Sequence, residues 1–467
     1  MLFPNAFTEI IKINYWRFRE SIRIGRQEYA YNEVLFIKGR PGSGKTAGAL
    51  NYCQLYPSTL YFSFANLDTA FAPRLFSKRY PNVFRECQTW KAFFDQLYDY
   101  AIKRHCTIFF DDAAVRSDKD EFIEQLQRVL NQNSKYAFLV VFLLKPWEEL
   151  PLPAKTEILE PMSPAALRRE MGIKDEDTFR LYTLTDGNPY LLDQYDREQS
   201  FEDNIRSWLA YDSRYYRLAA KWMVDCFRSP ESYNTLQYGM AMGLNRVSEL
   251  SDLSGFPMNK VDKYLKALAE HHLIVREKES GSRTHYALAN NYLKLWYRFL
   301  MPSSLINDGS IPENTISAFM EYLDNVLVPE TFRRTVLQWL DWTYKHYIQG
   351  HIDVHKPYMQ DAMGKGVRFD YVFKSDARAN RYIVVKLFDH LEERCRKEDW
   401  HAIDDAVSSV VPYYESTLIL ASIHRFSDYC WETTSKRDNV KLVQIQTLNR
   451  VGFNNSRERM QLEQARS

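Results

Sequence analysis

The sequence has little that points to export, a membrane or a metal cluster. Its 6 cysteines are scattered and none forms a Cys-x-x-Cys pair, which argues against a zinc site and a disulfide framework. The longest strongly apolar run, Ala137 to Leu144, is far too short to span a bilayer. The first residues lack a basic stretch followed by an apolar run. We therefore expect a cytoplasmic protein with no membrane partner.

An excess of charge of one sign is also missing. Lys plus Arg number 61 against 60 for Asp plus Glu, so no global field attracts nucleic acid and any polyanion site must be local. Low-complexity tracts are absent, and 45% of the residues are hydrophobic, a value typical of folded proteins. A chain of 467 residues is long enough for about three domains, and we expect it to be globular throughout.

The first part of the chain alternates short apolar runs with stretches of helical spacing. This pattern is typical of a mostly parallel sheet whose strands are joined by helices, and it predicts an α/β fold. The expected strands are Val34–Lys38, Leu60–Phe64, Thr107–Phe110, Ala137–Leu144 and Thr156–Leu159. The expected helices between them are Lys45–Leu55, Trp90–Lys103 and Lys119–Leu130, with Thr89 as an N-cap.

Shifts in composition, together with Gly, Pro and polar stretches, predict five parts of the chain. They are a core of alternating strands and helices (1–160), a helical lid (161–228), a winged helix (229–300), a second α/β domain (301–453) and a polar tail (454–467). Within the lid, Thr178 to Ala220 reads as helical with a break at Asp186 to Pro189, where Gly and Pro end one helix and start another. Three helical stretches and a small hairpin between Tyr233 and Leu288 have the layout of a winged helix.

A phosphate-binding loop follows the first expected strand. Its residues fit the spacing G-x-x-x-x-G-K-[S/T] and are Gly39, Arg40, Pro41, Gly42, Ser43, Gly44, Lys45 and Thr46. Glycines allow consecutive N–H groups to face phosphate oxygens, and the helix that follows adds a favourable dipole. Lys45 is expected to neutralise the β- and γ-phosphates of ATP, and Thr46 to offer a hydroxyl to Mg²⁺.

Two acids end the third expected strand. A magnesium nucleotide site needs a carboxylate at the end of a neighbouring strand, and Asp111 and Asp112 follow the apolar run Thr107–Phe110. We predict that Asp111 binds magnesium, directly or through water, and that Asp112 orients the attacking water. The alternative is a strand that simply ends in an acidic helix cap.

The expected winged segment is ambiguous as a DNA-binding element. On Asn259–His271 the apolar residues form one stripe and three lysines face elsewhere, as a helix offered to a DNA groove requires. Arg276, Lys278 and Arg283 could grip phosphates from the hairpin. From Pro230 to Leu288 there are nevertheless as many acidic as basic residues, so a role in intramolecular or protein contacts is an equal alternative.

The C-terminal region resembles a metal-dependent nuclease with one ligand missing. Asp370 and Lys386 match a pattern in which an Asp is followed, a strand later, by acid-x-Lys, but Val384 occupies the place of the second acid. Loss of one carboxylate from so small a set should cripple a site for a hard cation. We expect no nuclease activity, unless Glu330 or another acid compensates.

Taken in order, these motifs resemble the archaeal-type prokaryotic ATPases of the AAA/STAND branch. The resemblance covers about Glu33 to Ala421 and includes Thr185–Leu192, Tyr286–Leu288 and Leu295–Phe299. It implies ATP and Mg²⁺ as cofactors, a lid hinge at Gly187 and Pro189, and a C-terminal domain of unknown function with a restriction-endonuclease-like core. It also implies a γ-phosphate-sensing arginine, for which Arg168 and Arg169 are guesses, and self-association.

Two departures from that family bear on hydrolysis. The family carries Asp-Glu where this chain has Asp111 and Asp112, and a small polar residue where this chain has Leu143-Leu144-Lys145. We therefore expect a slowly hydrolysing ATPase that acts as a nucleotide-gated regulatory switch. The alternatives are a DNA-binding or DNA-cutting effector that uses ATP for assembly, and a non-hydrolysing nucleotide-dependent scaffold.

Overall fold

The computed structural model describes residues 19, 22, 33–65, 71–104, 106–113, 119–132, 138–211, 213–278, 284–303, 311–344, 358–360, 366–374, 381–410 and 415–449. The chain forms two compact units, each built from three stretches. The first takes in the chain up to Glu160, Asn188–Gln194 and Arg217–Ala289, and the second takes in Pro161–Gly187, Tyr195–Tyr216 and Asn290 onward. The five domain boundaries expected from sequence stay predictions.

A five-stranded parallel sheet forms the centre of the first unit. Its strands are β1 (Glu33–Lys38), β2 (Thr59–Ser63), β3 (Thr107–Asp111), β4 (Leu139–Leu144) and β5 (Lys155–Ile158), in the order β2-β3-β4-β1-β5. Together with the loop after β1, this arrangement confirms the predicted fold class, a P-loop NTPase sheet. The predicted strand ends lie within two residues of the observed ones.

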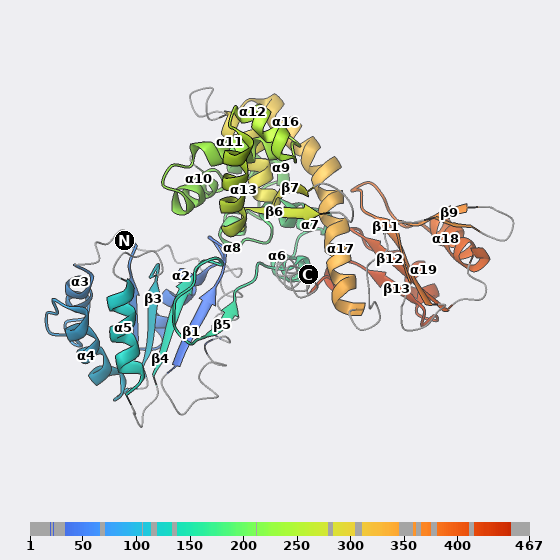
Figure 1. The fold of residues 1–467 in the computed structure, drawn as a ribbon. Helices are drawn as coiled ribbons and strands as arrows, with labels where there is room; N and C mark the ends of the chain where they lie inside the picture. Colours follow the sequence, from blue (N-terminus) through green and yellow to red (C-terminus); the bar gives the residue numbers. More distant parts are fainter. Residues whose placement is uncertain are drawn as a thin grey trace. The chain divides into compact units, whose positions relative to one another are not determined.

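Four helices accompany the sheet: α2 (Lys45–Leu55), α3 (Ala72–Arg79), α4 (Trp90–Ala101) and α5 (Lys119–Leu130). Both α2 and α5 match their predicted bounds, whereas α4 ends two residues before the predicted Lys103 and α3 was not predicted. The predicted cap is confirmed, since the hydroxyl of Thr89 accepts a hydrogen bond from the N–H of Ala92 at 3.2 Å. Each sheet face buries alternate residues, with α3, α4 and α5 packed on one face and α2 on the other (Figure 1).

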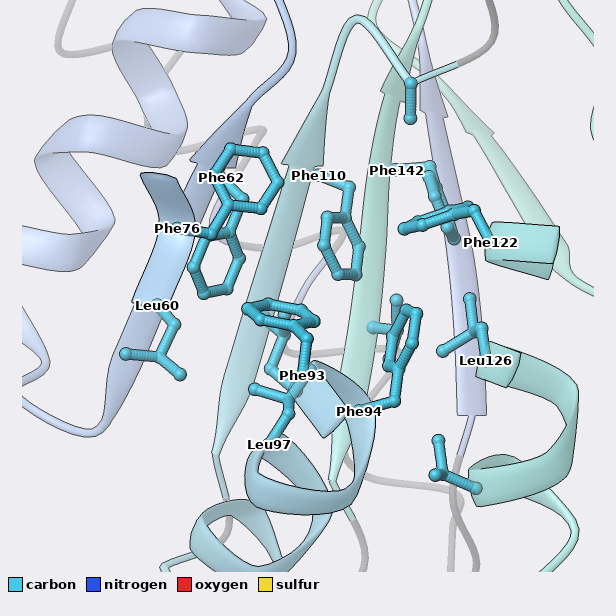
Figure 2. Close-up of a cluster of buried hydrophobic side chains, with 14 of the residues drawn as sticks. Leu60, Phe62, Phe76, Phe93, Phe94, Leu97, Phe110, Phe122, Leu126 and Phe142 are labelled. Atoms are coloured by element: carbon cyan, nitrogen blue, oxygen red, sulfur yellow. The ribbon is translucent and has the colours of Figure 1, made fainter. Parts of the chain in front are cut away.

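Aromatic rings dominate the core on the α3–α5 face. Figure 2 shows Phe62, Phe110 and Phe142 of three adjacent strands meeting Phe93 and Phe94 of α4. The rings of Phe62 and Phe110 stack at 5.6 Å, and those of Phe110 and Phe142 at 5.4 Å. Such pairs add to the burial of large apolar surface, so the rows of Phe hold the three strands, and with them the strand ends, in register.

Three helices and a hairpin complete the first unit: α11 (Glu231–Ala241), α12 (Val247–Ser254), α13 (Met258–Glu270), β6 (Ile274–Lys278) and β7 (Thr284–Leu288). The two strands pair antiparallel. On α13, Val261, Leu265 and Leu268 are fully buried, as the apolar stripe predicts. These elements follow the predicted order, while their assignment as a winged helix stays a prediction.

The predicted helical stretch around the Gly-Pro break is observed as four helices: α7 (Asp175–Thr185), α8 (Pro189–Leu192), α9 (Phe201–Leu209) and α10 (Arg214–Cys226). The predicted break is confirmed. Asp186 and Gly187 adopt left-handed φ values of 49° and 68°, which end α7, and Pro189 begins α8.

The second unit adds further helices and two small sheets. The helical elements are α6 (Pro164–Met171), α14 (Asn291–Leu295), η2 (Trp296–Leu300), α15 (Met301–Ser303), α16 (Glu313–Tyr322), η3 (Leu323–Leu327), α17 (Val328–Tyr344), α18 (Lys397–Val410), α19 (Asp428–Thr434) and η4 (Ile445–Thr447). A hairpin is formed by β8 (Tyr358–Gln360) and β9 (Gly366–Arg368). The larger sheet has the order β10-β11-β12-β13, with β10 (Tyr371–Lys374), β11 (Arg381–Phe388), β12 (Glu415–Ser422) and β13 (Val440–Val443).

None of the helices in the described part of the chain is long and apolar enough to cross a membrane.

Candidate phosphate and metal site

The strand order brings the predicted motifs to one edge of the sheet. Strand β4 lies between β1, which leads into the phosphate loop, and β3, which ends in Asp111. Because these strands are parallel, their carboxyl ends meet at the same edge, where open α/β sheets bind ligands. The N–H of Gly39 donates to the carbonyl of Leu144 at 3.1 Å, which ties the start of the loop to the end of β4.

The loop turns sharply at two glycines. Gly42 and Gly44 have φ values of 81° and 92°, in the left-handed region that side chains disfavour. A Cβ atom at Gly42 would lie 2.5 Å from the side-chain oxygen of Asn188. That side chain also donates to the carbonyl of Pro41 at 2.9 Å, and the N–H of Tyr190 donates to the carbonyl of Gly42 at 3.2 Å. The start of α8 therefore clamps the loop in its turned shape.

Lys45 holds its ammonium inside the loop. Its Nζ donates to the carbonyls of Gly39 at 2.6 Å and Arg40 at 3.2 Å, and lies 3.4 Å from the hydroxyl of Ser43. The residue as a whole is half-buried, but the charged end is desolvated. Burial lowers the pKa of Lys45 to about 8, although nearby carboxylates, Asp111 first, oppose that shift. Because desolvation of the ammonium outweighs the nearby carboxylates, the ammonium is suited to binding phosphate oxygens.

The side chains of Thr46 and Asp111, the two predicted magnesium ligands, meet at this edge of the sheet. The hydroxyl of Thr46 donates to Oδ2 of Asp111 at 2.7 Å, although the two residues are 65 positions apart in the sequence. Asp111 is 5% exposed, and its Oδ1 accepts from the N–H of Asp112 at 3.1 Å. Thr46 as a residue is exposed, while the carboxylate that its hydroxyl contacts is buried.

Asp112 stands in an unusual backbone position. Its φ is 55°, a left-handed conformation that Asp adopts more readily than most residues. Burial, followed by the neighbouring charge of Asp111, raises the pKa of Asp112. A half-buried carboxylate whose affinity for a proton is raised suits the predicted role of a base that orients water.

The structure adds an ion pair that the sequence did not reveal. Lys145 and Glu148 form a turn after β4, in which the Lys145 N–H donates to Glu148 Oε2 at 2.7 Å and the Lys145 Nζ lies 3.5 Å from Glu148 Oε1. The charges of both residues act on Lys45, and that of Lys145 also acts on Asp112. Lys145, noted from sequence only as a departure, thus belongs to this edge of the sheet.

The residues present fit a nucleotide with a magnesium ion. The loop is a cradle that a Cβ at Gly42 would obstruct, its lysine donates to the carbonyl of Gly39, and a hydroxyl and a carboxylate lie together at its end. In the described ranges no cluster of three or more His, Cys, Asp or Glu could hold a metal ion. Magnesium in nucleotide sites typically binds one or two protein ligands together with phosphates and water.

Arg168 and Arg169, the guessed phosphate sensors, have partners within the second unit. The Nε of Arg168 donates to Asp175, and that of Arg169 lies 2.8 Å from Glu170. Their assignment as sensors stays a guess.

The nuclease-like pattern also lies in the second unit. The Nζ of Lys386 lies 3.2 Å from Oδ2 of Asp370, and the N–H of Leu387 donates to the same oxygen at 2.8 Å. Val384 is fully buried in the cluster that contains Trp400, on the face where the second acid is expected. Glu330, the suggested substitute, accepts from Lys294 at 3.1 Å. Apolar packing therefore fills the place of the missing ligand.

On α13, two of the three lysines are engaged locally. The Nζ of Lys266 lies 3.1 Å from Asp262, and that of Lys260 lies 3.9 Å from the ring centroid of Phe256. Lys263 and, on β6, Arg276 are exposed. The side chain of Lys278 and all of Arg283 lie outside the described residues.

Comparisons with known proteins give distant likenesses. No protein-family model matches the chain. An uncharacterized protein of Methanocaldococcus jannaschii is 22% identical over 320 residues, which cover 62% of this chain and 70% of that protein. A Pyrococcus horikoshii STAND protein with a tetratricopeptide repeat sensor is 15% identical with a TM-score of 0.30, over 70% of this chain.

This chain spans about half the length of the STAND protein, 50%. The Cdc6p protein of Pyrobaculum aerophilum is 12% identical with a TM-score of 0.33, over 70% of this chain and 97% of that one. The fold assignment therefore rests on strand order and the phosphate loop rather than on these likenesses.

Proposed function

We propose that the chain binds ATP with magnesium at the phosphate loop, hydrolyses it slowly and acts as a nucleotide-gated regulatory switch. The observation that carries this proposal is the hydrogen bond between Thr46 and Asp111, which joins a magnesium-binding hydroxyl to a carboxylate at the end of the loop. Lys45 would bind the terminal phosphates and stabilise charge that develops on them. Asp112 would orient the water and accept its proton. A bound magnesium ion would supply further neutralisation of phosphate charge.

A contact between the turn after β4 and α13 supports the switch. The ring of Trp147, within the Lys145–Glu148 turn, lies 5.3 Å from that of His271, the C-cap of α13. The Nδ1 of His271 is buried with no hydrogen-bond partner among the described residues. Polar atoms left in this state are costly, so small movements of the turn change the free energy of this contact. A phosphate that attracts Lys145 would therefore bias the position of α13.

Hydrogen exchange tests the switch. Addition of ATP and magnesium should slow or speed amide exchange at the end of α13 in the wild type, and leave it unchanged in Lys45→Ala. Trp147→Ala should still bind ATP but lose the response in α13. The switch fails if ATP binds the wild type and exchange in α13 does not change. Phosphate release at saturating ATP, absent in Lys45→Ala, separates a slow ATPase from the non-hydrolysing scaffold.

Exposed Lys263 and Arg276 favour DNA as a second partner. Both lie on elements of the expected winged helix, where cations would contact phosphates and add salt dependence to binding. A gel-shift assay with duplex DNA at low and moderate salt, with Lys263→Ala as the matched variant, tests this function. If no shift appears at low salt, DNA binding is ruled out as a function.

Self-association also stays a prediction. Sedimentation with and without ATP tests whether the chain self-associates.

A further inference from the structure

The magnesium-site carboxylate has a second hydroxyl donor. Oδ2 of Asp111 accepts from the hydroxyl of Tyr61 at 2.8 Å as well as from Thr46 at 2.7 Å. With the N–H of Asp112 on Oδ1, three donors from three parts of the chain fix the orientation of this carboxylate. Hydrogen bonds to a charged group are among the stronger ones in proteins. Tyr61 therefore contributes to where the oxygens of Asp111 point.

A tyrosine at this position is costly unless its hydroxyl is used. Tyr61 is 5% exposed and packs in the apolar cluster on the α2 face, together with Phe109. The residue beside Tyr61 in the adjacent strand and on the same face, Phe109, is a phenylalanine, so a ring without a hydroxyl fits this cluster. The hydroxyl of Tyr61 donates to the carboxylate of Asp111, so the polar end of the buried ring has a partner.

The main chain of Tyr61 is also held. Strand β2 lies at the edge of the sheet, so the outward N–H and carbonyl of its residues have no neighbouring strand. The hydroxyl of Tyr80 satisfies both groups of Tyr61, accepting from its N–H at 3.0 Å and donating to its carbonyl at 3.1 Å. The guanidinium of Arg79 lies 5.7 Å from the Tyr61 ring centroid. The end of α3 thus fixes Tyr61 from outside the sheet.

We propose that Tyr61 is a positioning residue for the magnesium site, which holds the carboxylate of Asp111 in the orientation that a cation and its water ligands require. The inference rests on the proposed function, since it assumes that Asp111 serves a magnesium nucleotide. Residues that orient a ligand by hydrogen bonding typically alter metal affinity by 10–100-fold when they are changed. Tyr61 acts through Asp111 and does not itself touch the nucleotide.

The test is a magnesium titration of Tyr61→Phe in the presence of ATP. The signal is the rise in melting temperature that the bound complex produces, which does not depend on turnover. The midpoint is the magnesium concentration that gives half of that rise. We expect the half-saturating magnesium concentration to rise about tenfold, as for loss of one hydrogen bond to a carboxylate. Affinity for ATP in EDTA, measured by calorimetry, should stay within about twofold of the wild type because Lys45 and the loop are unchanged.

Two further variants keep the inference falsifiable. Tyr98→Phe removes a hydroxyl from a half-buried tyrosine on α4, in the core on the other face of the sheet, and should leave the magnesium midpoint unchanged. Should Tyr61→Phe fail to fold, Tyr80→Phe loosens the main chain of Tyr61 and should raise the midpoint about two- to threefold. An unchanged midpoint in the folded Tyr61 variant, or an equal loss of ATP affinity with and without magnesium, overturns the positioning role.

These outcomes are separate from failure of the proposed function. If Lys45→Ala binds ATP as well as the wild type does, the nucleotide site itself is wrong. If Lys45→Ala loses binding while Tyr61→Phe titrates magnesium normally, only the role of Tyr61 is wrong.

Discussion

The pKa of Lys45 makes the strength of ATP binding depend on pH. In the nucleotide-free chain burial lowers that pKa to about 8, whereas phosphate oxygens around the ammonium would raise it again. Above pH 8 the lysine must therefore take up a proton before it can bind phosphate. With a bound-state pKa well above 9.5, linkage predicts that the Kd for ATP rises about 25-fold between pH 7.5 and pH 9.5.

Calorimetry in buffers of different ionisation enthalpy measures both the Kd for ATP and the number of protons taken up on binding. Proton uptake on binding should be about half a proton at pH 8 and nearly one at pH 9.5. The phosphate groups titrate near pH 6, so they contribute little in this window. Lys45→Arg is the matched control, because an arginine stays charged and should show a flat Kd whatever its absolute affinity. If the Kd of the wild type does not change with pH, or if the Kd of Lys45→Arg changes equally, the claim that burial lowers the pKa of Lys45 is refuted.

Three further predictions concern the loop, the base and the C-terminal sheet. Gly42→Ala should weaken ATP binding about tenfold or more, because a left-handed φ and the close approach of Asn188 both disfavour a Cβ; ATP titration of the variant checks this. Asp112→Asn should keep ATP binding but lower phosphate release about 100-fold, measured with a phosphate sensor under saturating ATP. Val384→Glu should restore no nuclease activity and should lower the free energy of unfolding by about 3 kcal/mol or more, since it buries a carboxylate among apolar side chains; chemical denaturation measures the loss.

Local signals explain what the sequence predicted correctly. Helix α2 begins at Lys45 because the loop motif itself sets the start, and α5 shows strong helical periodicity over Lys119–Leu130. The residue type of Thr89 alone predicted the N-cap of α4. Helix α3 was missed because it has only 8 residues, with a proline in its first turn, and too few turns to establish a period.

Contacts between distant segments explain what the sequence could not provide. Asn188 reaches Pro41 across 147 positions, and Tyr61 reaches Asp111 across 50, so no local pattern reports either pair. The strand order determines that β2 and β4 flank β3, and that order places Tyr61 beside Asp111. In the sequence, the one hint was that the apolar run of β2 contains a tyrosine, Tyr61, whose hydroxyl would need a hydrogen-bond partner when buried.

The central claim is that Gly39 to Thr46 bind the phosphates of ATP. Calorimetric titration of ATP with magnesium into the wild type and into Lys45→Ala tests it most directly. We predict saturable one-site binding to the wild type and an affinity at least about 100-fold lower in Lys45→Ala, as for loss of a charge-assisted contact to phosphate. Equal affinities, or no binding to the wild type, would contradict the account.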